Sequence, residues 1–190
     1  MPKILLITTG GTIASRCGEH GLRPVLMGEE LRTAMGAEWD EIEIRDYLSL
    51  DSCNIIPAYW EEFAREIDEL RTDYDGFIVT HGTDTMAYTS AALYYMLENL
   101  DRPVVLTGSQ RPLGVSGSDA EDNLRLAHRV ALFERTLADC ERVLGPDHPH
   151  TRLFRKNLAA AYRAVGRDED AAALLDPPSD PDDMDAEAPS

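Results

Sequence analysis

Long apolar runs are missing from this sequence. No stretch reaches the roughly 18 consecutive apolar residues that a membrane-spanning helix needs. The opening segment, MPKILLITTGGTIAS, is interrupted by threonines and glycines before it could form the apolar core of a signal peptide. We therefore expect a cytoplasmic protein that has no membrane as partner.

Cysteine and the common cofactor motifs are also scarce. The three cysteines, Cys17, Cys53 and Cys140, match neither a metal-ligand spacing nor an even disulfide framework, so free thiols are expected. GxxxxGK[ST], GxGxxG and GxSxG are absent. His81 and Asp84 lack a third ligand nearby, and His81 is expected to make a local hydrogen bond instead. We expect no cofactor and no metal.

Basic side chains are few. The chain has 18 lysines and arginines against 35 acidic residues, which gives a formal net charge of −17. Nucleic acids and anionic membrane surfaces would repel such a chain, so neither is expected as a partner. Lysine is the scarcest basic residue, since only Lys3 and Lys156 occur.

Composition divides the chain into three blocks. Residues 1–130 alternate β-branched runs with amphipathic ones, and residues 131–175 are rich in alanine and arginine at helical spacing. Residues 176–190 carry prolines and six acidic residues but few bulky apolar ones, so they cannot offset their own ordering entropy. The sequence predicts an α/β domain, a helical segment and a disordered acidic tail.

The first block predicts a parallel sheet covered by helices. Short apolar runs alternate with segments of helical periodicity, which is typical of the α/β class with helices on both faces of the sheet. The expected strands are 3–8, 41–48, 76–80 and 103–107, with helices after Pro57 and over 84–100. Tyr88, Tyr94 and Tyr95 on the last helix are expected to pack inside the fold.

Hydroxyl groups, glycines and an acid follow three of these strands, at 9–12, 81–85 and 108–111. Ligands of such sheets bind beyond the carboxyl ends of the strands, where exposed amides can hold an anion or a developing oxyanion. A threonine there could act as a nucleophile if a base activated it. The alternative, which is favoured for any single loop, is turn chemistry in which Thr83 or Asp84 caps the following helix.

Taken together, these loops resemble one enzyme family. The segments LITTGGTIAS (6–15), GFIVTHGTDTM (76–86), VLTGSQRP (105–112) and LDSCN (50–54) are similar to motifs of the bacterial-type L-asparaginases, closest to the cytoplasmic, type I-like branch. The resemblance runs from residue 1 to about 130. It implies a flavodoxin- or Rossmann-like amino-terminal domain, truncated here. It also implies hydrolysis of the small-molecule substrate L-asparagine to L-aspartate and ammonia, without cofactor or metal.

The resemblance also implies roles for matching positions. Thr12 would be the nucleophile that attacks the side-chain amide. Thr83 would belong to a second catalytic group with Asp84, which would also bind the α-ammonium of the substrate.

Further matches imply a substrate-binding set. Ser52 would hold the α-carboxylate, and Cys53 occupies a neighbouring contact position where serine or glutamine is more usual. Backbone amides around Gly11 and Thr83 would supply the oxyanion hole.

Two parts that the resemblance implies are missing. The family has a catalytic lysine downstream of residue 130, whereas Lys3 begins the first strand and Lys156 lies in a segment unlike the family. The smaller carboxyl-terminal domain, which forms much of the family's dimer, is absent too. We therefore expect impaired activity, and a homo-oligomer would lack most of the usual dimer surface. The alternative is a non-catalytic amino-acid-binding remnant or a repeat-mediated interaction module.

The helical segment has a resemblance of its own. From Ser118 no proline or glycine interrupts the chain until Gly145, so one long helix is expected, followed by helices over 153–165 and 171–175. Residues 133–172 resemble about one unit of a tetratricopeptide-type repeat. Such repeats bury their apolar faces by stacking, so a single unit is expected to dock on the flank of the sheet or to bind a partner helix.

Overall fold

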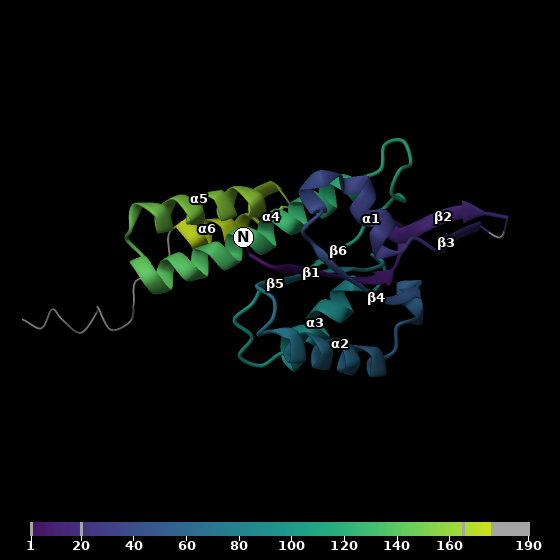
Figure 1. Ribbon diagram of the computed structural model, residues 1–190, viewed down its shortest axis with the longest axis horizontal. Coiled ribbons are helices and arrows are strands. Elements are labelled where there is room, and N and C mark those ends of the chain that lie inside the picture. Colours follow the sequence, from purple (N-terminus) through teal and green to yellow (C-terminus); the bar gives the residue numbers. More distant parts are fainter. Residues whose placement is uncertain (1, 20, 165, 176–190) are drawn as a thin grey trace, which may run out of the picture. The chain divides into compact units, whose positions relative to one another are not determined.

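The computed structural model of the chain, shown in Figure 1, describes residues 2–19, 21–164 and 166–175. Its contacts divide the chain into two compact units, Met1–Arg135 and Thr136–Ser190. The domain boundary expected near residue 130 stays a prediction. The acidic tail expected over 176–190 lies outside the described residues.

The core of the first unit is a four-stranded parallel sheet in the order β4-β1-β5-β6. Its strands are β1 (Ile4–Gly10), β4 (Glu43–Leu50), β5 (Gly76–Thr80) and β6 (Val104–Thr107). The predicted α/β class with a parallel sheet is confirmed. Since β1 lies between β4 and β5, the order reverses at β1, and ligands of such sheets bind at this switch point.

Both faces of the sheet are buried, which explains why β1 is a continuous apolar run. Successive side chains of a strand point to opposite faces. Ile4 and Leu6 therefore join one hydrophobic cluster, and Leu5 and Ile7 join another. A sheet that faced water on one side would show alternating polar residues instead.

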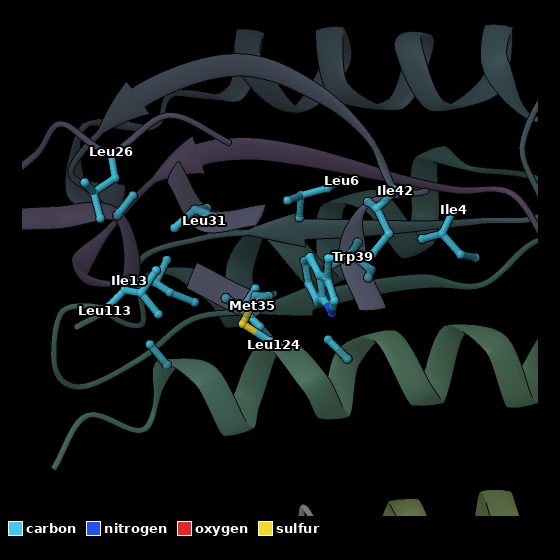
Figure 2. Close-up of a cluster of buried hydrophobic side chains, with 14 of the residues drawn as sticks. Ile4, Leu6, Ile13, Leu26, Leu31, Met35, Trp39, Ile42, Leu113 and Leu124 are labelled. Carbon is cyan, nitrogen blue, oxygen red and sulfur yellow. The ribbon is translucent and has the colours of Figure 1, made fainter. Parts of the chain in front are cut away.

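Helices α1 (Gly28–Met35) and α4 (Ala120–Leu144) contribute to the first cluster. Figure 2 shows Leu31, Trp39 and Leu124 gathered with strand residues, and each of these three side chains is fully buried. Burial of a large apolar side chain stabilises a fold by about 1.5–3 kcal/mol. The sequence predicted the continuous helix α4 but did not predict α1.

Helices α2 (Pro57–Leu70) and α3 (Met86–Met96) cover the other face (Figure 1). Pro57 occupies the first turn of α2, where its missing N–H has no helical partner to lose. Phe63, Ala64 and Ile67 form the buried side of α2, as the helical spacing predicted. Helix α3 is shorter than the predicted 84–100. Its tyrosines, Tyr88, Tyr94 and Tyr95, are exposed, so the expectation that they pack inside the fold is wrong.

A two-stranded antiparallel hairpin follows β1. It consists of β2 (Ser15–Gly18) and β3 (Gly21–Pro24). The hairpin was not expected from the sequence because its strands are too short to show an alternating pattern. The hairpin places Pro24 next to Ser15 in register.

The second unit is helical among its described residues. Helices α5 (Pro149–Ala164) and α6 (Asp168–Leu175) contact each other, and both begin earlier than predicted. Arg155 of α5 forms an ion pair with Glu141 at 2.5 Å, and Thr151 donates a hydrogen bond to the carbonyl of Gly145. Val165, the predicted last residue of the second helix, lies outside the described residues. None of the helices described combines the length and apolar character needed to cross a membrane.

Candidate active site

A pocket that opens to solvent lies beyond the carboxyl ends of β1, β4 and β5, and its empty space, with the open mouth included, is about 370 Å³. The loops after these three strands and the hairpin form its walls. Its lining residues are Gly11, Thr12, Ser15, Leu22, Pro24, Asp51, Ser52, Gly82, Thr83 and Asp84. Five of the six predicted site residues therefore line one pocket, and the sixth, Cys53, is adjacent to it.

Glycines allow the three loops to approach one another this closely. Gly11 has φ 76°, a left-handed conformation, and a Cβ there would lie 2.4 Å from the backbone nitrogen of Gly82. A Cβ on Gly82 would in turn lie 2.5 Å from Oγ of Ser52. The backbone N–H of Gly11 donates to the carbonyl of Leu50 at 2.9 Å. The loop after β1 is thus held between the loops after β4 and β5.

Most hydroxyl groups around the pocket are engaged by the protein itself. Thr9 donates to the carbonyl of Thr80 at 2.7 Å, Ser15 to that of Gly11 at 2.8 Å, and Thr85 to that of Ser52 at 2.8 Å. Each of these bonds fixes a loop.

Three hydroxyls that line the pocket are different. The structure records no hydrogen bond for the side chains of Thr12, Ser52 and Thr83 among the described residues. Ser52 is only 2% exposed, so its hydroxyl is largely shielded from water as well as unpaired. Thr12 and Thr83 are partly exposed, so water and a ligand can reach them from the pocket. Buried polar groups normally have partners, which indicates that the Ser52 hydroxyl is available to a ligand.

Turn chemistry does not account for Thr83 and Asp84. Helix α3 begins at Met86, and its N-cap residue is Thr85, which makes no side-chain capping bond. The Thr85 hydroxyl instead reaches Ser52 in the neighbouring loop. The capping alternative for Thr83 or Asp84 is therefore wrong.

The charged wall of the pocket is acidic. Asp51 and Asp84 are exposed, and the thiol of Cys53 donates a hydrogen bond to Oδ2 of Asp84 at 3.6 Å. Desolvation and the neighbouring carboxylates of Asp51 and Asp84 raise the pKa of the Cys53 thiol, so it remains neutral at pH 7. Cys53 therefore fits a polar contact better than a nucleophile.

Among the described residues, the group that most resembles a set of metal ligands consists of Asp51, Cys53 and Asp84. Their donor atoms lie within 4.8 Å of one another, and all three residues are exposed. Exposed acidic groups are common without a metal, so this grouping does not by itself indicate one. The expectation of no metal stays a prediction.

His81, at the end of β5, is buried behind the pocket. Its Nδ1 lies 2.7 Å from the carbonyl oxygen of Gly82, which can only accept, so Nδ1 carries the proton. Nε2 then accepts from the Thr89 hydroxyl at 2.9 Å, and that oxygen accepts from Nε1 of Trp60 at 2.9 Å. The expected local hydrogen bond of His81 is confirmed. Burial lowers the pKa of His81, which keeps the ring neutral.

The pocket wall includes no amine or imidazole among the described residues that line it; Asp51 and Asp84 are its ionisable side chains. Lys3 precedes β1 and forms an ion pair with Glu43 at 2.9 Å. At about 3.3 Å per residue, the length of β1 separates Lys3 from the pocket by roughly 20 Å.

Some lining residues were missed from the sequence. Ser15, Leu22 and Pro24 reach the pocket through the hairpin, which was not predicted. Asp51 could have been predicted as a pocket residue from the sequence, because it follows a predicted strand and precedes Ser52. It caps the short turn after β4 by accepting from the backbone N–H of Cys53 at 3.0 Å.

Comparisons with known proteins identify the family. The family model described as "Asparaginase, N-terminal" matches residues 3–142. The L-asparaginase of Thermococcus kodakarensis is 45% identical over 128 residues, which is 66% of this chain and 39% of that protein. L-asparaginase 1 of Escherichia coli K12 is 38% identical over 184 residues, 92% of this chain and 52% of that protein.

A solved structure shares the fold. The thermostable L-asparaginase from Thermococcus kodakarensis superposes with a TM-score of 0.63 at 45% identity, covering 68% of this chain and 40% of that chain. The present chain thus spans about half or less of the length of the relatives that it matches. The motifs at the strand ends, the parallel sheet and the matched family model lead to one conclusion: the chain belongs to the asparaginase family and corresponds to its amino-terminal domain.

Proposed function

We propose that this domain is an asparaginase-type amidohydrolase in which Thr12 attacks the side-chain amide of L-asparagine. The observation that supports this most directly is the set of three unpaired hydroxyls, from Thr12, Ser52 and Thr83, in a pocket that also presents Asp84. An amino-acid zwitterion needs one carboxylate for its ammonium group and donors for its carboxylate, and this pocket has both.

Binding would use opposite sides of the pocket. The carboxylate of Asp84 attracts the α-ammonium, and the hydroxyl of Ser52 donates to the α-carboxylate. Because Ser52 is buried and unpaired, a ligand oxygen would satisfy it without displacing a protein partner. The side-chain amide of the substrate then lies toward the threonines.

The chemical step would be acyl transfer. The Thr12 hydroxyl loses its proton as Oγ forms a bond to the amide carbon, the C–N bond breaks, and the nitrogen takes up one proton and leaves as ammonia. Backbone N–H groups near Gly11 and Thr83 stabilise the oxyanion. Water then hydrolyses the ester, which releases L-aspartate and restores the Thr12 hydroxyl.

We infer that catalysis is impaired in this chain. A threonine hydroxyl is a weak nucleophile at neutral pH and needs a base, yet the described lining has only carboxylates, and the Lys3 amine pairs with Glu43. The same observation favours a second candidate function, a non-catalytic domain that binds an amino acid such as aspartate in this pocket.

The helical segment 131–175 stays outside this mechanism. Its resemblance to a tetratricopeptide-type repeat remains a prediction, and the asparaginase family model extends into it, to residue 142. A location in the cytoplasm likewise remains a prediction.

Ammonia release from L-asparagine tests the enzyme. We expect a slow rate for the full chain that falls to the buffer background in Thr12→Ala. The matched control is Thr72→Ala, an exposed threonine in the turn after α2, which should keep the full rate. Parallel assays with L-glutamine establish which amide is preferred.

Calorimetric titration with L-aspartate separates the two candidates. Equal background rates in the wild type and Thr12→Ala, combined with aspartate binding that is lost in Asp84→Asn, would establish the binding domain. If neither turnover nor binding is detected in a folded chain, both candidate functions are wrong.

A further inference from the structure

A chain of three hydrogen bonds runs through the first unit and ends at the wall of the pocket. Nε1 of Trp60 donates to Oγ1 of Thr89 at 2.9 Å, and Thr89 donates to Nε2 of His81 at 2.9 Å. Nδ1 of His81 then donates to the carbonyl of Gly82 at 2.7 Å. We refer to Trp60, Thr89 and His81 as the histidine relay. Its members come from α2, α3 and the loop after β5.

The two ends of the relay fix the direction of every bond in it. The indole of Trp60 can only donate, and the carbonyl of Gly82 can only accept. Thr89 and His81 are both fully buried, so water does not compete for these bonds. If the proton of His81 were on Nε2, then Nδ1 would be an acceptor facing a carbonyl oxygen. Donation from Thr89 to Nε2 therefore keeps the proton on Nδ1, where Gly82 needs it.

The carbonyl at the end of the relay belongs to the same peptide unit as the N–H of Thr83. A trans peptide is planar, so its C=O and its N–H point in opposite directions. His81 lies behind the pocket, whereas Gly82 and Thr83 line it. The N–H of Thr83 thus points away from His81 and toward the pocket. Among the described residues, the structure records no hydrogen bond from this N–H.

We propose that His81 is a positioning residue, which acts through the Gly82 carbonyl to aim the Thr83 N–H at the side-chain oxygen of a bound amino acid. The inference rests on the proposed function, because it requires that the pocket binds an amino acid. His81 is not among the residues that line the pocket, so its effect on a ligand is transmitted by the peptide.

Gly82 explains why this peptide needs support. A glycine has no Cβ to restrict the rotation of its backbone. A stiffer residue does not fit, because a Cβ at this position would lie 2.5 Å from Oγ of Ser52. Without the bond from His81, the carbonyl of Gly82 would lose its buried partner and turn toward water in the pocket. The N–H of Thr83 would then turn away from the ligand.

Two substitutions of His81 separate positioning from packing. The amide nitrogen of asparagine reaches as far as Nδ1, so His81→Asn keeps a donor for Gly82 and loses the contact with Thr89. Glutamine reaches as far as Nε2, so His81→Gln keeps the contact with Thr89 and leaves Gly82 without a donor. Both variants lose the ring, and urea denaturation should show a similar loss of stability in the two. His128→Gln, at a half-buried histidine that does not line the pocket, is the control.

Binding of L-aspartate provides the functional measurement, because its side-chain carboxylate takes the place of the substrate amide. In calorimetric titration, we expect the wild type, His81→Asn and His128→Gln to have the same dissociation constant. The dissociation constant of His81→Gln should be about tenfold higher, since one hydrogen bond to a charged oxygen is lost. A purely structural role for His81 would weaken binding equally in both His81 variants.

NMR with isotope-labelled threonine follows the peptide directly. The amide signal of Thr83 is assigned by its loss in Thr83→Ser. Aspartate should move this signal downfield in the wild type and in His81→Asn, and leave it nearly unchanged in His81→Gln.

The outcomes distinguish this inference from the proposed function. If the wild type binds aspartate but His81→Gln gives the wild-type affinity and the wild-type shift of Thr83, the positioning role is overturned and the pocket stands. The same holds if His81→Asn binds as weakly as His81→Gln. If the wild type shows neither heat of binding nor any shifted threonine amide, the pocket does not bind the amino acid, and the proposed function fails together with this inference.

Discussion

At the scale of single residues, the pocket depends on which polar groups the protein leaves unpaired. Three hydroxyls near the pocket donate hydrogen bonds to backbone carbonyls, namely those of Thr9, Ser15 and Thr85. The hydroxyls of Thr12, Ser52 and Thr83 have no such partner among the described residues. The difference does not lie in residue type, since both groups are serines and threonines. It lies in how closely the three loops approach.

Gly11→Ala should test that close approach. The substitution forces a left-handed conformation on alanine and places its Cβ against Gly82, so we expect the free energy of unfolding to fall by more than about 2 kcal/mol. Gly114→Ala is the matched control, because φ there is 79° but nothing lies within 4 Å of the added carbon. Urea denaturation measures both. Equal losses would mean that the contact with Gly82 contributes nothing beyond backbone strain.

At the scale of elements, the loop between β6 and α4 is anchored by one carboxylate. Asp119, just before α4, accepts the backbone N–H groups of Gln110 and Arg111 and the side-chain amide of Asn123. Desolvation raises the pKa of Asp119, but these hydrogen bonds outweigh it and the pKa is lowered. The loop and the start of α4 are therefore tied together.

Asp119→Ala should lower the free energy of unfolding by about 2 kcal/mol, since it removes a charged acceptor from several N–H groups. Asp122→Ala, in the first exposed turn of α4, should change it by less than about 0.5 kcal/mol. The loss at Asp119 should shrink as the pH falls below 4, because a lowered folded-state pKa stabilises only while the carboxylate is ionised. A loss that is independent of pH would contradict this account.

Two histidines should make the first unit sensitive to mild acid. Burial lowers the pKa of both His81 and His128, and the His128 ring packs against Trp39 with centroids 5.5 Å apart. Below about pH 6.5 the unfolded chain binds protons that the folded chain does not, so stability falls as the pH decreases. His128 is thus a half-buried residue packed against Trp39 and not a solvated surface residue.

We expect the free energy of unfolding, measured in urea, to be lower at pH 5.5 than at pH 7.5. His128→Gln should show a smaller fall between these two values than the wild type, because one of the two groups is gone. This window lies above the range in which carboxylates titrate. An unchanged fall in His128→Gln would mean that His128 is not responsible.

At the scale of the whole molecule, negative charge is in large excess. Because the net charge is −17, the charges of the compact chain repel one another. This repulsion destabilises the compact state, and salt screens it.

The folded chain should therefore become more stable as salt is added. Between about 20 mM and 150 mM sodium chloride we expect the free energy of unfolding to rise, because the Debye length shortens to about 8 Å. Urea denaturation at three salt concentrations measures it. A free energy of unfolding that falls with salt would mean that attractive ion pairs outweigh the repulsion.

Much of the architecture could be predicted from local pattern. The four strands, helix α2 and the long helix α4 appeared close to their expected positions, because each has a clear apolar period or a clear stop signal. The hairpin β2–β3 and helix α1 were missed, since a four-residue strand has too few positions to establish a period. Three pocket residues depend on that hairpin, so they were missed with it.

The sequence alone determined the strand ends, the family motifs and the residues that could do chemistry, because these follow from short runs of neighbouring residues. Only the tertiary structure decided which hydroxyls remain unpaired, and that one face of α3 is left uncovered. Hydrogen-bond partners and covering surfaces come from segments far apart in the chain: Thr12, Ser52 and Thr83 meet because Gly11 and Gly82 let three loops close on one another. The close contact between these loops cannot be predicted from any local sequence pattern.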